Sequence, residues 1–570
     1  MGVGAVVIQP NEKLPLDASA ATLSSERVIA HDAAIDERAA KAPPKTLPAG
    51  GAGLVALGIL LSRIAGVIRT SVFAHYLGDS SAADAFTAGF RIPNILQNLL
   101  GEGVLSASFI PVYSRLLGEG EEEMAELLAW GVGAILAAMV AILVLVGITA
   151  APYLIAVIAP GFAGDRRQLT IAIVRVLFPC TGLLVMSAWC LGVLNSHHKF
   201  FMSYVAPVAF NFAMIVALLF YGPRRSQDAL VIDIAWAAVI GAGLQIVVQL
   251  PQLMKLLGIL HLNFAKVAAS LRAVFNNLVP VVISRGVGQV SGYIDTVLAS
   301  LLPIGAVADL NYGQIFYMLP VSLFGLSVAA AELPSMSRAA ARSEDIEKVL
   351  RGRLNSGLRQ IAFLVVPSAA AFFAIGDVIV ALVFQSGHFT HREAVYVWAV
   401  LAGSGVGMLA GTMGRLYNSA FYALWDTRTP LKFALIRVTL SFVLGYLFAI
   451  PLPHMIGIAQ RWGVAGLTSS AGIAAWVEFA LLRWKLNQRV GWTGLDRKFL
   501  AQLWGMAIIA GVAAFAIKTI TPHMGPRPQA ALVIPAFGAI YLGLAYLLDL
   551  PELQGFLGMI RRRLNVRASS

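Results

Sequence analysis

Long hydrophobic runs, separated by short polar connections, recur along almost the whole chain, from about residue 52 to about residue 550. Each run is long enough to cross the ~30 Å hydrocarbon core of a bilayer as a helix. The pattern predicts about fourteen transmembrane helices and therefore an all-α polytopic membrane protein. These helices are expected near residues 52–76, 85–112, 127–150, 168–194, 203–221, 230–254, 275–300, 308–331, 358–383, 394–422, 432–451, 464–484, 500–519 and 531–549.

Composition and charge support a membrane protein. Of the 570 residues 58% are hydrophobic and only 13% are charged. The net charge of +12 is unevenly distributed: with the N-terminus inside, the inward loops and C-terminal tail carry 22 of the 42 Lys and Arg residues, and the outward loops carry 8. This positive-inside asymmetry places both termini in the cytoplasm and implies an even number of spans. The basic charge thus points to a membrane rather than to nucleic acid.

The chain also resembles itself at an offset of 222 to 223 residues. The matching segments are LSRIAGVI at Leu61 with ISRGVGQV at Ile283, IPVYSR at Ile110 with LPSMSR at Leu333, and VLNSHHKFFMSYVAP at Val193 with LYNSAFYALWDTRTP at Leu416. Their order and offset are kept across two blocks of six predicted helices. An even number of spans per block makes this a parallel repeat, with a pseudo-twofold axis along the membrane normal.

The repeat predicts the domain organisation. We expect a disordered cytoplasmic tail over residues 1–50, a first six-helix lobe over 51–257 and a second over 258–490. Two extra transmembrane helices follow over 491–552, and a basic cytoplasmic tail over 553–570 ends the chain. Transporters that rock two halves around a central site are built from such repeats.

Seven arginines fall inside the predicted spans: Arg63, Arg69, Arg91, Arg175, Arg285, Arg415 and Arg437. Charged residues at membrane depth are costly and usually mark a functional site. Arg63 and Arg285 occupy matching places in the first helix of each repeat, and Arg69 follows Arg63 by six residues. A guanidinium group binds two oxygens of a phosphate or carboxylate at once, so we expect these side chains to bind an anion in a cavity between the lobes.

The second helix of each repeat carries residues that interrupt helices. The first such segment, DAFTAGFRIPNILQNLLGEGVLSASFIPVYSR from Asp84, contains Pro93, Gly101, Gly103 and Pro111, with Arg91 and Glu102 on either side of the expected break. Its counterpart FYMLPVSLFGLSVAAAELPSMSR contains Pro320 and Pro334 and holds Glu332. Broken helices at matching places in two halves indicate the substrate site of a transporter.

Motifs of soluble and membrane enzymes are missing from the sequence: there is no P-loop, no H-E-x-x-H, no paired CxxC and no G-x-S-x-G after a strand. No cofactor is expected, and transport would draw on an ion gradient, the membrane potential or the substrate's own gradient. Asp295 lies ten residues after Arg285, about 15 Å along one helix, so the two cannot neutralise each other. We expect Asp295 to hold a monovalent cation or a proton, or to pair with a basic residue on another helix, and favour the cation.

Several motifs carry a resemblance to a known family. They are SRIAGVIR, DAF…FRIPN…GEGVLSASFIPVY, APGF at Ala159, LFP at Leu177, LNS…F…APVAFN from Leu194, QIVVQLPQL from Gln245 and FQSGHFT from Phe384. Over roughly residues 52–490 the chain resembles the MurJ/MviN family, lipid II flippases of the multidrug/oligosaccharidyl-lipid/polysaccharide exporter superfamily.

The resemblance implies a fold of fourteen helices: two six-helix lobes and two extra helices that form a lipid-facing groove. It implies that lipid II, the undecaprenyl-diphosphate-linked disaccharide-pentapeptide, moves from the inner to the outer leaflet of the bacterial inner membrane, and that basic cavity residues bind its diphosphate. Membrane lipids and other cell-wall synthesis proteins are the expected partners. The candidate substrate-binding residues are Ser62, Arg63, Arg69, Asp84, Arg91, Asn94, Glu102 and Arg285.

Two departures from the family pattern concern these charges. Many members have a basic residue where this chain has Gln97-Asn98, and an Asp-Arg pair where it has Gln314-Ile315. Arg285, one helix earlier, is the expected substitute. The alternatives are a flippase for another polyprenyl-diphosphate-linked oligosaccharide, a drug/cation antiporter, a membrane enzyme acting on polyprenyl diphosphates, and a non-transporting scaffold. An antiporter should have an acidic cavity, an enzyme should show clustered carboxylates or a nucleophile, and a scaffold would not need buried arginines.

Overall fold

The computed structural model describes residues 49–258, 261–342 and 346–554, and these are helical apart from turns, loops and one isolated bridge between Ser386 and Phe389. Twelve helical runs among the described residues are long and apolar enough to cross a membrane. The predicted fold class is confirmed, and the predicted number of fourteen spans is approximate. Residues 1–48 of the expected tail over 1–50, and residues 555–570 of the basic tail over 553–570, lie outside the described residues.

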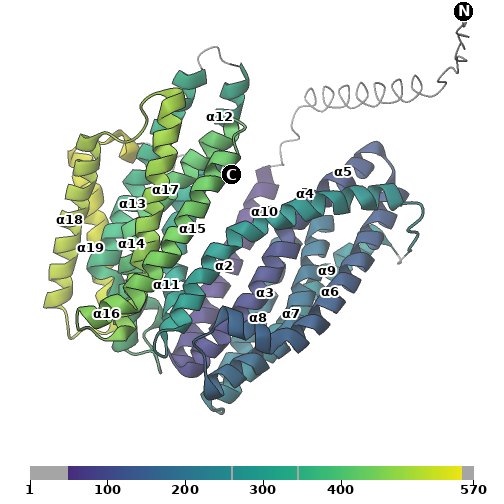
Figure 1. Cartoon of the computed structure of the whole chain (residues 1–570), viewed down its shortest axis with the longest axis horizontal. Coiled ribbons are helices and arrows are strands. Elements are labelled where there is room, and N and C mark those ends of the chain that lie inside the picture. The colour runs from purple at the N-terminus through teal and green to yellow at the C-terminus, as the bar shows by residue number, and fades with distance from the viewer. Residues whose placement is uncertain (1–48, 259–260, 343–345, 555–570) are drawn as a thin grey trace, which may run out of the picture. The chain divides into compact units, whose positions relative to one another are not determined.

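The chain divides into two compact units, Met1–Ala56 and Leu57–Ser570, and everything that follows concerns the second unit. Its first half contains the helices drawn from purple to blue in Figure 1. They are α2 (Ala49–Leu77), α3 (Ser81–Leu100), α4 (Glu102–Ser108), α5 (Ile110–Glu119), α6 (Glu122–Ile158), α7 (Gly164–Ser196), α8 (Phe200–Tyr221) and α9 (Gln227–Leu257).

The second half repeats this order of helices. It consists of α10 (Ala268–Ser300), α11 (Ala306–Pro320), the π-helix η1 (Val321–Leu326), α12 (Ser327–Arg342), α13 (Ile346–Phe384), α14 (His391–Ala423), α15 (Arg428–Ala449), α16 (Pro451–Met455), the 3₁₀ turn η2 (Gln460–Trp462) and α17 (Gly463–Val490). Helices in matching places have matching lengths: α7 and α14 have 33 residues each, and α8 and α15 have 22 each.

The second helix of each half is interrupted, as the sequence predicts, but at fewer places. In the first half α3 ends at Gly101, where a Cβ would lie 2.2 Å from the carbonyl oxygen of Gln97, so only glycine fits this close approach. In the second half the π-helix η1 starts directly after Pro320. The expected breaks at Pro93 and Pro334 are wrong, because α3 and α12 continue through these prolines. A π-helix or an irregular turn at membrane depth is a common feature of functional sites.

Helices of the second half approach one another closely where both carry glycine. A Cβ on Gly407 of α14 would lie 2.2 Å from the Cα of Gly472 on α17. Close packing of small residues is how membrane helices gain van der Waals contact without a hydrophobic driving force. Two further helices, α18 (Arg497–Ile520) and α19 (Pro526–Leu547), pack against each other and against α13. Lys518 of α18 pairs with the buried Asp377 of α13 at 2.6 Å.

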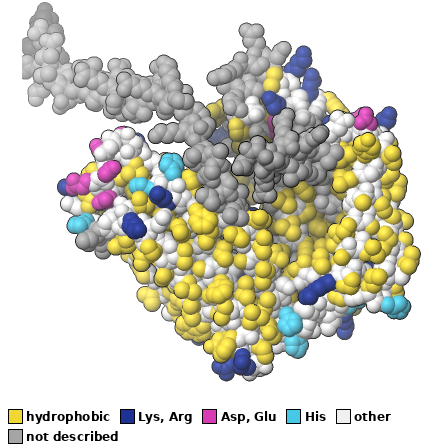
Figure 2. Space-filling model, turned by 180° about the vertical axis from the view of Figure 1, so that it is seen from behind, with side chains coloured by type: hydrophobic (Ala, Val, Ile, Leu, Met, Phe, Trp, Pro, Cys, Tyr) yellow, Lys and Arg dark blue, Asp and Glu magenta, His cyan; other side chains and the backbone are white. Residues whose placement is uncertain are grey.

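Helix α10 connects the two halves. It packs against α3, α4, α5 and α6 of the first half and against α11, α15 and α17 of the second, and in Figure 1 it runs alongside the helices of the first half. The surface of the molecule is apolar over a broad region. On the face drawn in Figure 2, hydrophobic side chains cover the middle, and charged side chains gather mostly toward its upper and lower ends. This distribution is typical of a protein whose middle part lies in the hydrocarbon core of a membrane.

Candidate functional site

The arginines of α2 reach membrane depth without a carboxylate partner. Arg69 is half-buried; its guanidinium carbon lies 5.8 Å from the centre of the Phe90 ring, and Nη1 lies 3.9 Å from the sulfur of Met214. Arg63 is exposed and Ser62 is half-buried. Within the described part of the chain neither arginine forms an ion pair. No carboxylate in the described part of the structure therefore competes with an anion for either guanidinium group.

Arg91 of α3 reaches across to the second half. Its Nη2 donates a hydrogen bond to Oε1 of Gln314 on α11 at 3.1 Å, while its Nε has no partner among the described residues. Gln314 is one of the two residues that replace the family's charged pair, so the uncharged position still takes part in a contact between the lobes. Asn94, three residues after Arg91, is exposed.

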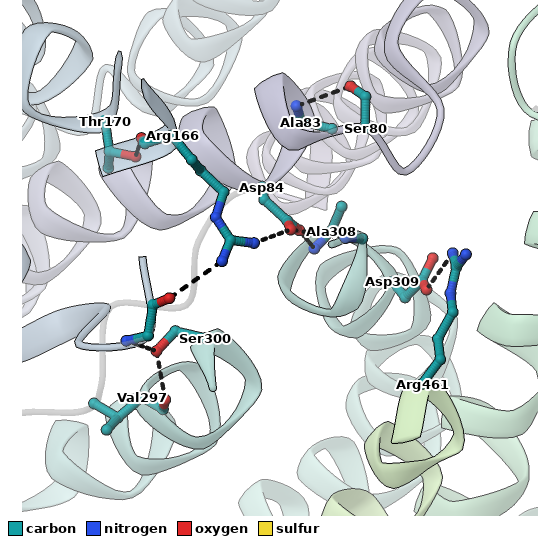
Figure 3. Close-up of polar contacts among 12 residues, drawn as sticks. Ser80, Ala83, Asp84, Arg166, Thr170, Val297, Ser300, Ala308, Asp309 and Arg461 are labelled. Atoms are coloured by element: carbon teal, nitrogen blue, oxygen red, sulfur yellow. Dashed lines mark hydrogen bonds and ion pairs between the residues drawn. The ribbon is translucent and has the colours of Figure 1, made fainter. Parts of the chain in front are cut away.

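Asp84 lies in the contact between the two lobes. The side chain is fully buried, and its two oxygens already have partners. The backbone N–H groups of Gly305 and Ala308 donate to Oδ2 and Oδ1 at 2.7 and 2.9 Å, and Nη1 of Arg166 lies 3.3 Å from Oδ2 (Figure 3). Asp84 thus caps the start of α11 from the opposite lobe, where the helix dipole favours a negative charge. We therefore assign it to the contact between lobes and not to the phosphate site.

An ion-pair contact joins the lobes beside these backbone bonds to Asp84. Arg461 of η2 pairs with Asp79, in the connection between α2 and α3, and its Nη2 also lies 3.4 Å from Oδ2 of Asp309 on α11. The Tyr396 ring lies 3.7 Å from the Arg461 guanidinium carbon. Asp309 and Arg461 are drawn beside Asp84 in Figure 3.

We call Asp79, Asp84, Arg166, Asp309 and Arg461 the outer cluster, because they lie at helix ends predicted to face outward. Of these five residues, only Asp84 was predicted from the sequence to be a site residue. Asp309 could have been identified by comparing the two halves, because it occupies in α11 the place that Asp84 occupies in α3. Each is the fourth residue of its helix.

Three further hydrogen bonds reinforce the same closure. The Tyr312 hydroxyl donates to the carbonyl oxygen of Gly78 at 2.7 Å. The His388 N–H donates to the carbonyl oxygen of His75 at 2.8 Å, and the Ser71 hydroxyl donates to that of Val383 at 2.6 Å. All three join the last turns of α2 or its following residue to the second half, so the two lobes are held together at this end.

The remaining predicted site residues are only partly placed. The side chains of Glu102 and Arg285 lie outside the described part of the structure. Asp295 interacts electrostatically with Arg91 on α3 and Arg437 on α15, so basic residues from two other helices face it. Among the described residues, no group of three or more His, Cys, Asp or Glu side chains is arranged to hold a metal ion. Occupation of Asp295 by a cation stays a prediction.

A protein-family model described as lipid II flippase MurJ matches residues 73–527. The chain belongs to this family. The lipid II flippase MurJ of Burkholderia cenocepacia is 30% identical over 508 residues, which cover 86% of this chain and 95% of that protein. A protein of Rhizobium meliloti named a probable lipid II flippase MurJ is 29% identical over 526 residues, which cover 89% of this chain and 95% of that protein.

Solved structures agree on the fold. A lipid II flippase MurJ in an inward closed conformation matches with a TM-score of 0.70 at 20% identity, covering 87% of this chain and 98% of that one. An inward-facing multidrug transporter of the MATE family and MOP superfamily matches with a TM-score of 0.60 at 17% identity, covering 75% and 94%. Family membership confirms the resemblance noted in the motifs and the class of transporter rather than enzyme.

Proposed function

We propose that this MurJ-family protein flips lipid II from the inner to the outer leaflet of the bacterial inner membrane by alternating access, with both termini in the cytoplasm. The lipid II substrate follows from the family, whose curated members named above are lipid II flippases. The observation that carries the mechanism is the pairing of charges. The ends predicted to face outward are closed by the Arg461 ion pair and by backbone bonds to Asp84, whereas the arginines of α2 have no carboxylate partner among the described residues.

The unpaired arginines suit the chemistry of a diphosphate. A diphosphate that leaves the headgroup region loses water, and that loss is costly unless protein charges replace it. Arg69 stands eight residues before the end of α2, about 12 Å along the helix, and Arg63 about 9 Å further from that end. Two guanidinium groups at different depths would receive the diphosphate in succession while the polyprenyl tail stays in lipid.

The closed outer ends define the step that must follow binding. For the headgroup to leave outward, the bonds from Gly305 and Ala308 to Asp84 and those of Arg461 must break. Bound substrate shifts this equilibrium only if it binds the outward-open state more tightly than the closed one. We propose an ion gradient or the membrane potential as the energy source for the cycle.

The test is rescue of a bacterial strain depleted of its own lipid II flippase, followed by a leaflet-specific lipid II assay. The wild-type chain should restore growth and expose lipid II on the outer leaflet. A matched variant, Arg69→Ala, should reach the membrane in normal amounts and fail in both. If the wild-type chain is well expressed and lipid II stays inside, the proposed substrate is wrong. A parallel assay with other undecaprenyl-diphosphate oligosaccharides then identifies the alternative cargo.

A further inference from the structure

Five charged side chains from five helices form an alternating series at membrane depth. Nη1 of Arg437 on α15 lies 3.1 Å from Oε2 of Glu478 on α17, and the Glu478 side chain is 8% exposed. Asp295 on α10 interacts electrostatically with Arg437 and with Arg91 on α3. At the other end, Arg415 on α14 interacts with Glu478 and Arg437. The order Arg91, Asp295, Arg437, Glu478, Arg415 thus alternates in sign from one lobe into the other.

The series contains three guanidinium groups and two carboxylates, so one positive charge is left over. Glu478 has its close contact with Arg437, and Asp295 lies between Arg91 and Arg437. Arg415 is half-buried, and its guanidinium forms no hydrogen bond and no ion pair within the described residues. A guanidinium at this depth without a close ion pair is costly, and such residues mark substrate or ion pathways.

Tyr317 brings a hydroxyl donor to the same place. A Cβ on Gly411 of α14 would lie 3.8 Å from the Tyr317 hydroxyl, and Gly411 lies one helical turn before Arg415 on the same face. Tyr317 also interacts electrostatically with Arg415 and Arg437. Among the described residues, this hydroxyl donates no hydrogen bond. Two unused donor groups, from α11 and α14, therefore face one region of the second lobe.

We infer that Arg415 and the Tyr317 hydroxyl form an anion-binding subsite in the second lobe that takes a phosphate group of the lipid-linked diphosphate. The inference rests on the proposed function. It identifies a phosphate contact in the second lobe that the sequence motifs did not identify. The second lobe has Gln314-Ile315 where family members have an Asp-Arg pair. Arg415 supplies the missing cation, and the Arg437–Glu478 pair next to it leaves its donors free.

The position of the subsite fits the proposed cycle. Arg415 lies eight residues before the end of α14 at Ala423, about 12 Å from the end predicted to face the cytoplasm. Arg63 and Arg69 belong to the first lobe and Arg415 to the second. One anion that contacts both lobes stabilises whichever arrangement brings these cations together, which is the differential binding that alternating access requires.

Binding of inorganic pyrophosphate to the purified full-length protein in detergent tests the subsite. We expect Arg415→Ala to weaken pyrophosphate binding roughly tenfold or more, and Arg415→Lys to weaken it less, because lysine keeps the charge but loses the two-oxygen contact. Tyr317→Phe should weaken it roughly threefold, as one neutral hydrogen bond is lost. Arg224→Ala, in an exposed loop between α8 and α9, is the matched control and should bind as the wild type does.

Thermal unfolding separates ligand binding from architecture. Arg415→Ala leaves the Arg437–Glu478 pair intact and should keep the wild-type Tm, whereas Arg437→Ala strands the buried Glu478 carboxylate and should lower it. Wild-type pyrophosphate affinity in both Arg415→Ala and Tyr317→Phe, or no pyrophosphate binding by the wild type, overturns the subsite. The flippase proposal is judged independently by the leaflet assay. If the wild-type chain binds pyrophosphate through Arg415 but leaves lipid II in the inner leaflet, the subsite is supported. Only the assignment of lipid II as the substrate is then wrong.

Discussion

Replacing Asp84 by asparagine should open the outward ends of the two lobes. The carboxylate accepts one hydrogen bond on each oxygen from α11 and pairs with Arg166 of its own lobe. Asparagine keeps one acceptor oxygen but turns an NH₂ group toward the second backbone N–H, so two donors face each other. The Arg166 guanidinium loses its counter-charge at the same time.

The size of the effect follows from which partners belong to which lobe. One hydrogen bond to a charged acceptor contributes about 1.5–3 kcal/mol, and the Asp84 side chain is 1% exposed, so solvent does not screen the loss. Only the bonds from Gly305 and Ala308 cross between the lobes. The equilibrium between closed and open outer ends should therefore shift by roughly 10- to 150-fold toward opening. Loss of the Arg166 contact should instead lower the stability of the first lobe, because both partners belong to it.

Spin labels at two outward positions measure this shift. Arg224→Cys in the first lobe and Ile456→Cys in the second are both exposed, and the two native cysteines are buried, which protects them from the label. Asp84→Asn should lengthen the distance between the labels, and the exposed Asp228→Asn of α9 serves as the control. An unchanged distance distribution in Asp84→Asn would refute the gating argument, even if the Tm falls, because Asp84 would then stabilise only its own lobe.

Three further changes test other parts of the structure. Arg63→Ala and Arg69→Ala should each reduce lipid II flipping at least roughly tenfold at normal membrane levels, and lysine should restore little in the leaflet assay because it lacks the planar fork. Gly101→Ala should lower stability by about 1–3 kcal/mol in thermal unfolding, since its Cβ meets a carbonyl oxygen at 2.2 Å. A cysteine at His391 should react with an impermeant maleimide added outside and one at Lys348 should not; the reverse result would invert the topology.

The sequence predicted those features that depend on local patterns. Hydrophobic length identified the spans, and glycine and proline located the interruptions at Gly101 and Pro320. The break expected at Pro93 is wrong, because a proline costs a helix one hydrogen bond without forcing it to end. Local sequence patterns could not predict the contacts of Asp84, because its partners Gly305 and Ala308 follow more than 220 residues later. Matching helix positions, with Asp84 and Asp309 each fourth in their helix, appear only once the helices of the two halves are compared.

The charges on the membrane-spanning helices fall into two groups, and the division answers why a membrane helix tolerates arginine. Asp84 with Arg166, and Glu478 with Arg437, are paired across helices, so each charge offsets the desolvation cost of the other and fixes how the helices meet. Arg69 and Arg415 have no such carboxylate contact among the described residues. No carboxylate among the described residues contacts them closely enough to offset this cost, and the cost falls when an anion binds. An arginine that pairs across the lobes, as Arg461 does with Asp79, holds them in one arrangement. Where an arginine has no paired carboxylate, the preferred arrangement of the two lobes depends on whether the diphosphate is bound.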